Sequence, residues 1–145
     1  MNLIENKERI FSQVAQAMET ANRTDQVNVI AVTKYVGIDQ AKALVDTGVR
    51  HIGENRVDKF LEKYQALKDE GLTWHLIGSL QRRKVKEVIN YVDYFHALDS
   101  MKLAQEIQKR ASHPIKCFIQ VNISGEESKH GFAPEELDAL LPEME

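Results

Sequence analysis

The sequence predicts an α/β protein in which helices cover a parallel β-sheet. Short runs rich in β-branched residues alternate with amphipathic segments along nearly the whole chain. The strand-like runs recur about every 22 residues, a spacing typical of consecutive βα units. No linker or low-complexity stretch interrupts this alternation, so residues 1–145 are expected to form a single domain.

The amino-terminal segment, residues 2–22, is expected to be an amphipathic helix that precedes the first strand. Its apolar residues recur mostly every three or four positions, and Asn2 and Glu5 have the spacing of a capping box. Strands are expected at residues 29–33, 50–52, 73–77, 94–98 and 116–122. Helices are expected at residues 38–47, 55–68, 81–90, 100–111 and 134–141.

Turn and capping residues support these boundaries. Gly48 follows a predicted helix, and Gly71 precedes the third predicted strand. Ser100 has the position of an N-cap, and Pro134 that of the first turn of the last helix. Pro142 is expected to end that helix.

The number of strands leaves two parallel architectures open. A (β/α)8 TIM barrel has eight strands and typically about 250 residues, whereas five strands are predicted here. An open doubly wound sheet can be complete with five strands. In both architectures, functional groups gather where strands end and the following loops begin, so these strand ends are the expected place of a site.

Composition argues against several functional classes. The chain has 145 residues, of which 43% are hydrophobic and 28% charged, with a formal net charge of −3, which is typical of a soluble globular protein. A cytoplasmic protein without membrane contact is expected, because no apolar run approaches a membrane span and the amino terminus does not resemble a signal peptide. The mildly acidic balance argues against nucleic-acid binding. The only cysteine, Cys117, is expected to pack in the core.

Lys34 is the most informative residue at the predicted strand ends. It follows the apolar run of residues 29–33, which is expected to form a buried strand, and it begins no helix. An amine withdrawn from water has a lowered pKa, and a neutral amine is what Schiff-base chemistry requires. The alternative is a lysine whose side chain extends from the strand into solvent.

Other polar residues at the strand ends have structural explanations that compete with function. Asn55 is a good helix N-cap, and Asn122 could satisfy a loop carbonyl. His75 lies on a buried strand, where a core histidine satisfied by hydrogen bonds is the alternative to a ligand. No metal site is predicted, because the five histidines lie one to a segment with no two at ligand spacing. A cofactor-free Schiff-base aldolase is a further alternative for Lys34. Such an enzyme would need an acid/base carboxylate near the amine, and Glu54 is the candidate.

Two polar segments complete the candidates. Residues 124–132 form a long, glycine-containing loop directly after a strand, a position from which loops often fold over ligands, and Lys129 would supply a cation there. The basic run at residues 81–86 is expected to be a solvated helix face. Neither a P-loop nor a dinucleotide-binding fingerprint is present, so a nucleotide enzyme is not predicted.

Four motifs together resemble the pyridoxal phosphate homeostasis protein family. They are AVTK at residues 31–34, HIGEN at 51–55, WHLIGSLQ at 74–81, and VNISG at 121–125 with Lys129 and Gly131. Their order and spacing match across essentially the whole chain. That family is similar to the barrel domain of bacterial alanine racemase, a fold-type III arrangement in which pyridoxal 5'-phosphate (PLP) sits at the barrel mouth.

The resemblance implies a cytoplasmic PLP carrier or buffer built on a TIM barrel, of which this sequence supplies an amino-terminal helix and five βα units. It implies that Lys34 forms the internal aldimine and that Asn55, His75, Asn122 and Lys129 line or approach the pocket. It implies no catalytic residue and no metal. The alternative within the same fold type is a PLP enzyme such as an amino-acid racemase.

Two departures from the family pattern modify these expectations. Arg83 stands where family members usually have asparagine, which concerns the rim of the site. Family members are also longer, and their phosphate-binding segments lie in the last strands and loops. The sequence is therefore expected to be an amino-terminal part of such a protein, monomeric or self-associating, that retains PLP poorly.

Overall fold

Five parallel strands form one sheet in the order β1-β2-β3-β4-β5 in the computed structural model, which describes residues 2–126 and 130–144. The strands are β1 (Ile30–Val32), β2 (His51–Glu54), β3 (Thr73–Leu76), β4 (Tyr94–Leu98) and β5 (Lys116–Ile119). The helices are α1 (Leu3–Thr20), α2 (Ile38–Asp46), α3 (Val57–Leu67), α4 (Val85–Val88), α5 (Met101–Arg110) and α6 (Leu137–Leu140). The predicted α/β class with a parallel sheet is confirmed.

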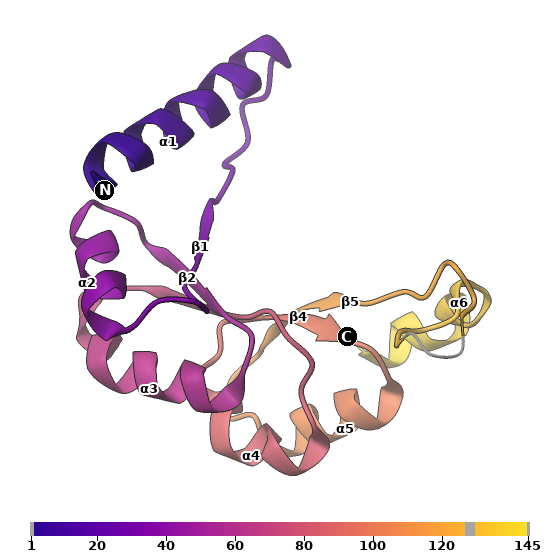
Figure 1. The fold of residues 1–145 in the computed structure, drawn as a ribbon. Helices are drawn as coiled ribbons and strands as arrows, with labels where there is room; N and C mark the ends of the chain where they lie inside the picture. The colour runs from indigo at the N-terminus through magenta and orange to yellow at the C-terminus, as the bar shows by residue number, and fades with distance from the viewer. Residues whose placement is uncertain (1, 127–129, 145) are drawn as a thin grey trace.

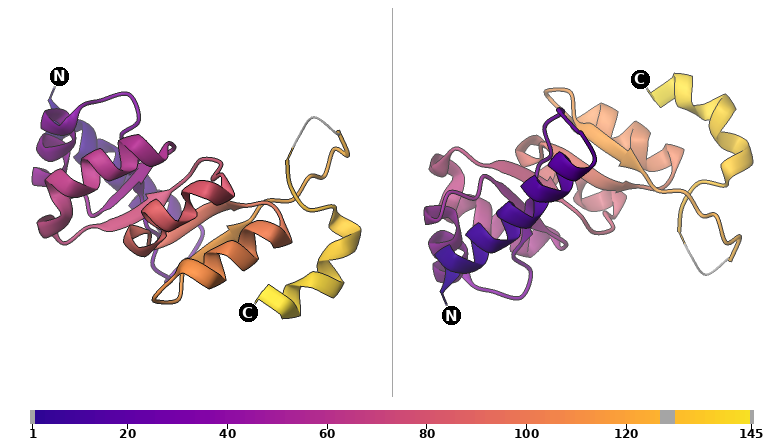
Figure 2. Two further views of the ribbon diagram at one scale, coloured as in Figure 1. Left: turned by 90° about the horizontal axis from the view of Figure 1, so that it is seen from below. Right: turned by 90° about the horizontal axis from the view of Figure 1, so that it is seen from above.

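The strand order decides between the two architectures that the sequence left open. Each strand pairs in parallel with the next one along the chain, without the reversal of order that defines a doubly wound sheet. Helices α2 to α5 form an arc on one face of the sheet (Figure 1). Consecutive strands with all crossover helices on one side are the arrangement of a βα barrel. Helix α1 leads into β1 at one edge, and α6 follows β5 at the other (Figures 1 and 2).

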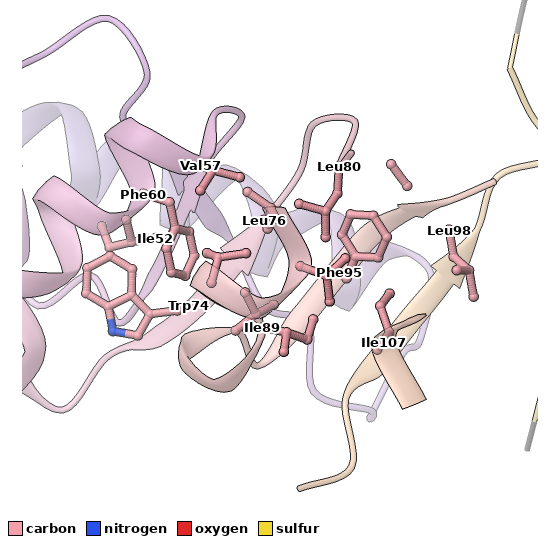
Figure 3. Close-up of a cluster of buried hydrophobic side chains, with 14 of the residues drawn as sticks. Ile52, Val57, Phe60, Trp74, Leu76, Leu80, Ile89, Phe95, Leu98 and Ile107 are labelled. Carbon is pink, nitrogen blue, oxygen red and sulfur yellow. The ribbon is translucent and has the colours of Figure 1, made fainter. Parts of the chain in front are cut away.

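The hydrophobic core lies between the sheet and helices α2 to α5. We call this side of the sheet the covered face. Its side chains include Ile52, Leu76 and Phe95, each fully buried, and Figure 3 shows them packed together. Trp74 contacts the Phe60 ring at a centroid distance of 5.5 Å in an edge-on geometry. Burial of these apolar side chains provides the main driving force for folding.

The opposite side, which we call the open face, carries side chains that the described residues leave partly uncovered. Val32, Gly53, His75, Tyr94 and Lys116 lie along one line of paired residues across the five strands, so they share this face. Val32 is 50% exposed, and the first strand is therefore not buried as its apolar sequence suggests. The prediction failed because apolar residues indicate a strand without telling which of its faces is packed.

Helices α1 and α5 begin at side-chain N-caps. The Asn2 and Ser100 side chains accept hydrogen bonds from the backbone N–H groups of Glu5 and Leu103, both at 3.1 Å, as predicted. Asn55 is not a cap, since α3 begins after Arg56. Pro142 does not end the last helix, because Leu141–Met144 continues as a 3-10 turn. Proline is compatible with the first turn of a helical segment, where its missing N–H needs no partner.

Several smaller predictions are also decided. The predicted helix at residues 81–90 is broken into α4 between the 3-10 turns Arg82–Lys84 and Ile89–Tyr91. Its basic residues face solvent while Val85 and Val88 are fully buried, as expected. Cys117 is unpaired and packs beside the core. Within the described residues, no helix is both long and apolar enough to span a lipid bilayer.

The difference between the two faces predicts different effects for two phenylalanines on neighbouring strands. Phe95 is fully buried on the covered face, whereas Phe118 is 55% exposed on the open face. We expect Phe95→Ala to lower the free energy of unfolding by about 3–5 kcal/mol and Phe118→Ala by about 1 kcal/mol. Urea denaturation measures both values, and equal losses would contradict the assignment of the two faces.

Candidate functional site

Lys34 is presented by a tight turn at the end of β1. The Val36 N–H donates a hydrogen bond to the Thr33 carbonyl at 3.2 Å, which closes a four-residue turn with Lys34 at its second position. The Lys34 side chain is exposed, and its Nζ lies 5.1 Å from the centroid of the Tyr35 ring. Among the described residues, no carboxylate lies within ion-pair distance of this amine. Lys34 therefore meets the predicted alternative, a side chain extending into solvent, because the strand before it is only partly covered.

Asn55 is the first residue after β2, the strand paired with β1, and β1 is followed by the turn that contains Lys34. Val32 is paired with Gly53, and the Thr33 N–H donates to the Gly53 carbonyl at 3.0 Å, so the two chains end at the same level of the sheet. With the described residues the Asn55 side-chain amide makes no hydrogen bond. It is thus available to a ligand that approaches the Lys34 amine.

Two glycines shape the surface around Asn55. A Cβ on Gly78 would lie 2.1 Å from the Asn55 carbonyl oxygen, so only glycine lets the loop after β3 pass this close to Asn55. Gly53 lies between the side chains of Ile30 and Ile77, where a Cβ would be 3.1 Å and 3.5 Å from their methyl groups. Gly53 is itself buried, so the side chains of Ile30 and Ile77 form the apolar environment at this place.

A buried cluster lies directly behind this turn, on the covered face. Its members are Thr33, Glu54 and Lys63, none more than 1% exposed, and we call them the ion-pair cluster. The Lys63 Nζ donates to Glu54 Oε2 at 2.6 Å and to the Thr33 carbonyl at 2.9 Å. The Thr33 hydroxyl also donates to Glu54 Oε2, at 2.6 Å, while Glu54 Oε1 is buried without a hydrogen-bond partner. Because the Glu54 carboxylate is bound to Lys63 on the covered face, it is not placed as an acid or base for Lys34.

Lys63 was not identified from the sequence, although a signal for it exists. It lies three residues after Phe60 and four before Leu67, on the apolar stripe of α3. A lysine on such a stripe is either extended to solvent or paired inside the protein. Here it is paired, with a carboxylate nine residues earlier in the sequence.

Three histidines from neighbouring strands form a second cluster, on the open face. His51 Nδ1 lies 3.0 Å from His75 Nε2, and His75 Nδ1 lies 2.9 Å from His96 Nε2. We call these three residues the histidine chain. These histidines are scattered along the sequence, one to a segment, but the fold brings them into contact. The separation of about 22 residues, equal to the strand repeat, is the signal that would have brought them together.

The histidine chain satisfies His75 rather than leaving it free for a ligand. Both His75 ring nitrogens are paired with other histidines, and its ring stacks on Tyr94 at a centroid distance of 4.7 Å. The three rings are linked in series, and no group of described residues has the arrangement of a metal site. The alternative that the sequence raised, a satisfied core histidine, describes the observed contacts.

Burial favours the uncharged forms of His75 and His96. Desolvation, followed by the neighbouring His96 and His51, lowers the pKa of His75 to about 4. Desolvation also lowers the pKa of His96. In its uncharged form the His75 ring carries one N–H that donates and one bare nitrogen that accepts, so it can bond to both neighbouring histidines.

Asn122 follows β5 and lies at the opposite edge of the sheet from Lys34. Its Nδ2 donates to the Glu126 carbonyl at 2.9 Å, while its Oδ1 accepts from the Ser124 hydroxyl at 3.0 Å and the Gly125 N–H at 3.2 Å. These bonds shape the loop after β5. Lys129, the other predicted site residue in this loop, lies outside the described residues.

The lowered pKa of His75 predicts an acid-sensitive stability. The unfolded chain binds a proton near pH 6.5, whereas the folded chain binds it only near pH 4, so stability is lost as the pH falls through this interval. We expect about 3 kcal/mol of this loss to disappear in the variant His75→Gln. Urea denaturation at several pH values measures it, with exposed His130→Gln as the control. An unchanged slope in His75→Gln would contradict the assignment.

The ion-pair cluster predicts a non-additive double variant. Lys63→Met leaves the Glu54 carboxylate buried and uncompensated, and we expect the free energy of unfolding to fall by about 3–5 kcal/mol. Glu54→Met combined with Lys63→Met removes both charges, so about 1 kcal/mol or less should be lost. Urea denaturation of the single and double variants gives the coupling energy. Additive losses would show that the two charges do not interact.

Comparison with known proteins identifies the family. The model of the alanine racemase N-terminal domain matches residues 6–145. A pyridoxal phosphate homeostasis protein of Aquifex aeolicus is 40% identical over 145 residues, covering 97% of this chain and 64% of the relative. One from Escherichia coli is 30% identical over 146 residues, covering 96% and 62%. The chain thus spans slightly less than two thirds of the relatives it matches.

Solved structures show the same fold. PipY of Synechococcus elongatus, determined with PLP bound, superposes with a TM-score of 0.81 at 28% identity, covering 99% of this chain and 64% of PipY. An unknown protein from Bifidobacterium adolescentis superposes with a TM-score of 0.85 at 32% identity, covering 98% and 63%. These comparisons confirm the predicted resemblance and fold. The chain belongs to the alanine racemase N-terminal domain family.

Proposed function

We propose that this chain is a cytoplasmic PLP-binding protein that carries or buffers the cofactor, with Lys34 as the point of covalent attachment. The observation that carries the proposal is the position of Lys34, in the turn that follows β1 and next to the end of β2, where Asn55 begins the neighbouring loop. The relatives named pyridoxal phosphate homeostasis proteins and the PLP-bound PipY structure support it.

The residues around Lys34 fit a planar aromatic aldehyde. PLP supplies an aldehyde, with which a neutral primary amine condenses and releases one water molecule. Lys34 provides the amine, and its exposure lets the side chain reach a ligand. Val32, which is half exposed, provides apolar surface of the kind that binds an aromatic ring.

The other predicted site residues receive more specific roles in this proposal. We assign Asn55 as a direct hydrogen-bonding partner of the ligand, because its amide is free and adjacent to Lys34. Both ring nitrogens of His75 are already paired with histidines, so we assign it no direct bond to the ligand. Its role is to hold His51 and His96 in place. Asn122 shapes the loop that carries Lys129, and we propose that this lysine binds an anionic group of the ligand.

Covalent labelling tests the proposal. The protein is titrated with PLP, the absorbance of the adduct is followed, and the adduct is reduced with borohydride and located by peptide mass. We expect the label on Lys34 and at least a tenfold loss of labelling in Lys34→Ala, with exposed Lys102→Ala as a control that labels normally. Label spread over surface lysines, or its persistence in Lys34→Ala, would overturn the proposal. We also expect dialysis to remove unreduced PLP readily.

The racemase alternative is tested with the same sample. Racemisation needs a second acid or base near Lys34, and Glu54, the carboxylate at the neighbouring strand end, is bound to Lys63 on the covered face. We expect no conversion of L-alanine to D-alanine by the PLP-loaded protein. Stereochemical inversion that depends on Lys34 would favour the racemase.

A further inference from the structure

We propose that Lys63 and Glu54 are positioning residues for Lys34. The ion-pair cluster fixes the turn from Thr33 to Val36, and with it the place from which the Lys34 side chain extends. This proposal rests on the proposed function of Lys34 as the attachment point for PLP. It assigns a role in ligand binding to two residues that touch neither the Lys34 amine nor the open face.

Thr33 is held by every polar group it has. Its N–H donates to the Gly53 carbonyl at 3.0 Å, and its hydroxyl donates to Glu54 Oε2 at 2.6 Å. Its carbonyl accepts from the Val36 N–H at 3.2 Å and from Lys63 Nζ at 2.9 Å. Because β1 ends at Val32, this carbonyl lies beyond the ladder of paired strands, and Lys63 supplies the bond that a strand partner would otherwise give.

The Lys63 ammonium group binds both to the residue that follows β1 and to the last residue of β2. Lys63 Nζ binds the carbonyl of Thr33 and the carboxylate of Glu54, and these residues directly precede Lys34 and Asn55. Thr33 and Glu54 are both bound to Lys63 of α3, and Lys34 and Asn55 begin the segments that follow them. Because Lys63 holds Thr33 and Glu54 at a fixed spacing, it also fixes the spacing of the residues that follow them, Lys34 and Asn55.

The energetics favour a role in geometry over a role in stability. A buried ion pair is often no more stabilising than apolar side chains of the same volume. Here the carboxylate is also imperfectly satisfied, because Glu54 Oε1 is buried without a partner. The cluster gains directed bonds to Thr33, which apolar residues cannot make. Such bonds define the position of the turn, and attachment reactions depend steeply on the placement of the reacting group.

The double variant Glu54→Met with Lys63→Met separates the two roles. Methionine keeps much of the volume of both side chains but makes no bond to the Thr33 carbonyl or hydroxyl. We expect a denaturation midpoint close to that of the parent chain and a Kd for PLP about tenfold higher, as for the loss of one charge-assisted hydrogen bond. The matched control is Lys59→Met, an exposed lysine of the same helix that pairs with Glu62.

A direct readout of the turn needs no PLP. The Val36 N–H reports the turn, since it bonds to the Thr33 carbonyl, and we expect its hydrogen exchange to become at least tenfold faster in the double variant. Exchange of the core amide of Phe95 should stay unchanged. A purely structural role would accelerate both amides or neither.

A conservative pair of variants at Thr33 covers the case in which the double variant does not fold. Thr33→Val keeps the branched shape and removes the hydroxyl, whereas Thr33→Ser keeps the hydroxyl that donates to Glu54. We expect weaker PLP binding and faster Val36 exchange in Thr33→Val, with both restored in Thr33→Ser.

The outcomes distinguish this proposal from the function on which it rests. If the parent chain does not label at Lys34, the proposed function fails, while Val36 exchange still reports whether the cluster fixes the turn. If the parent labels at Lys34 and a folded double variant keeps its Kd and its slow Val36 exchange, the positioning role is wrong. Parallel losses in the double variant and in Thr33→Val establish it.

Discussion

The contact between Lys63 and the ends of β1 and β2 is the interaction on which the geometry of the candidate site depends. A single ammonium group binds the carbonyl of Thr33, directly after β1, and the carboxylate of Glu54 at the end of β2. Because both partners are buried, the bonds are not exchanged for water, and neither charge can be removed alone without leaving the other uncompensated. The strand ends are consequently held at a fixed spacing by a residue that is itself part of the helical layer.

The parallel sheet divides the chemistry of the protein between its two faces. The covered face contains the apolar core and the ion-pair cluster, which supply stability and geometry. The open face carries the histidine chain and its aromatic neighbours, and Lys34 and Asn55 lie in the loops that follow β1 and β2. Because side chains alternate along a strand, a core residue is followed by a residue of the open face, as with Trp74 and His75 in β3.

Much of the fold could be predicted from the sequence, because the strand and helix periods and the capping residues act locally. The five strands and the caps at Asn2 and Ser100 depend on such local preferences. Lys34 also stood out, since it is the charge that ends an apolar run. The partnership of Lys63 with Glu54, and of His51 with His75 and His96, depends on strand register, which the local pattern does not specify.

The ion-pair cluster also helps to fix the register in which β1 pairs with β2. A shift of one residue in β1 would turn Thr33 toward the open face and Lys34 toward α3, because the side-chain period of a strand is two. β1 has only three paired residues and lies at an edge of the described sheet, so its ladder alone resists such a shift weakly. The Thr33 hydroxyl and carbonyl meet Glu54 and Lys63 in the observed register and would lose both partners in the shifted one. The ion-pair cluster therefore selects the register that leaves the Lys34 amine facing solvent.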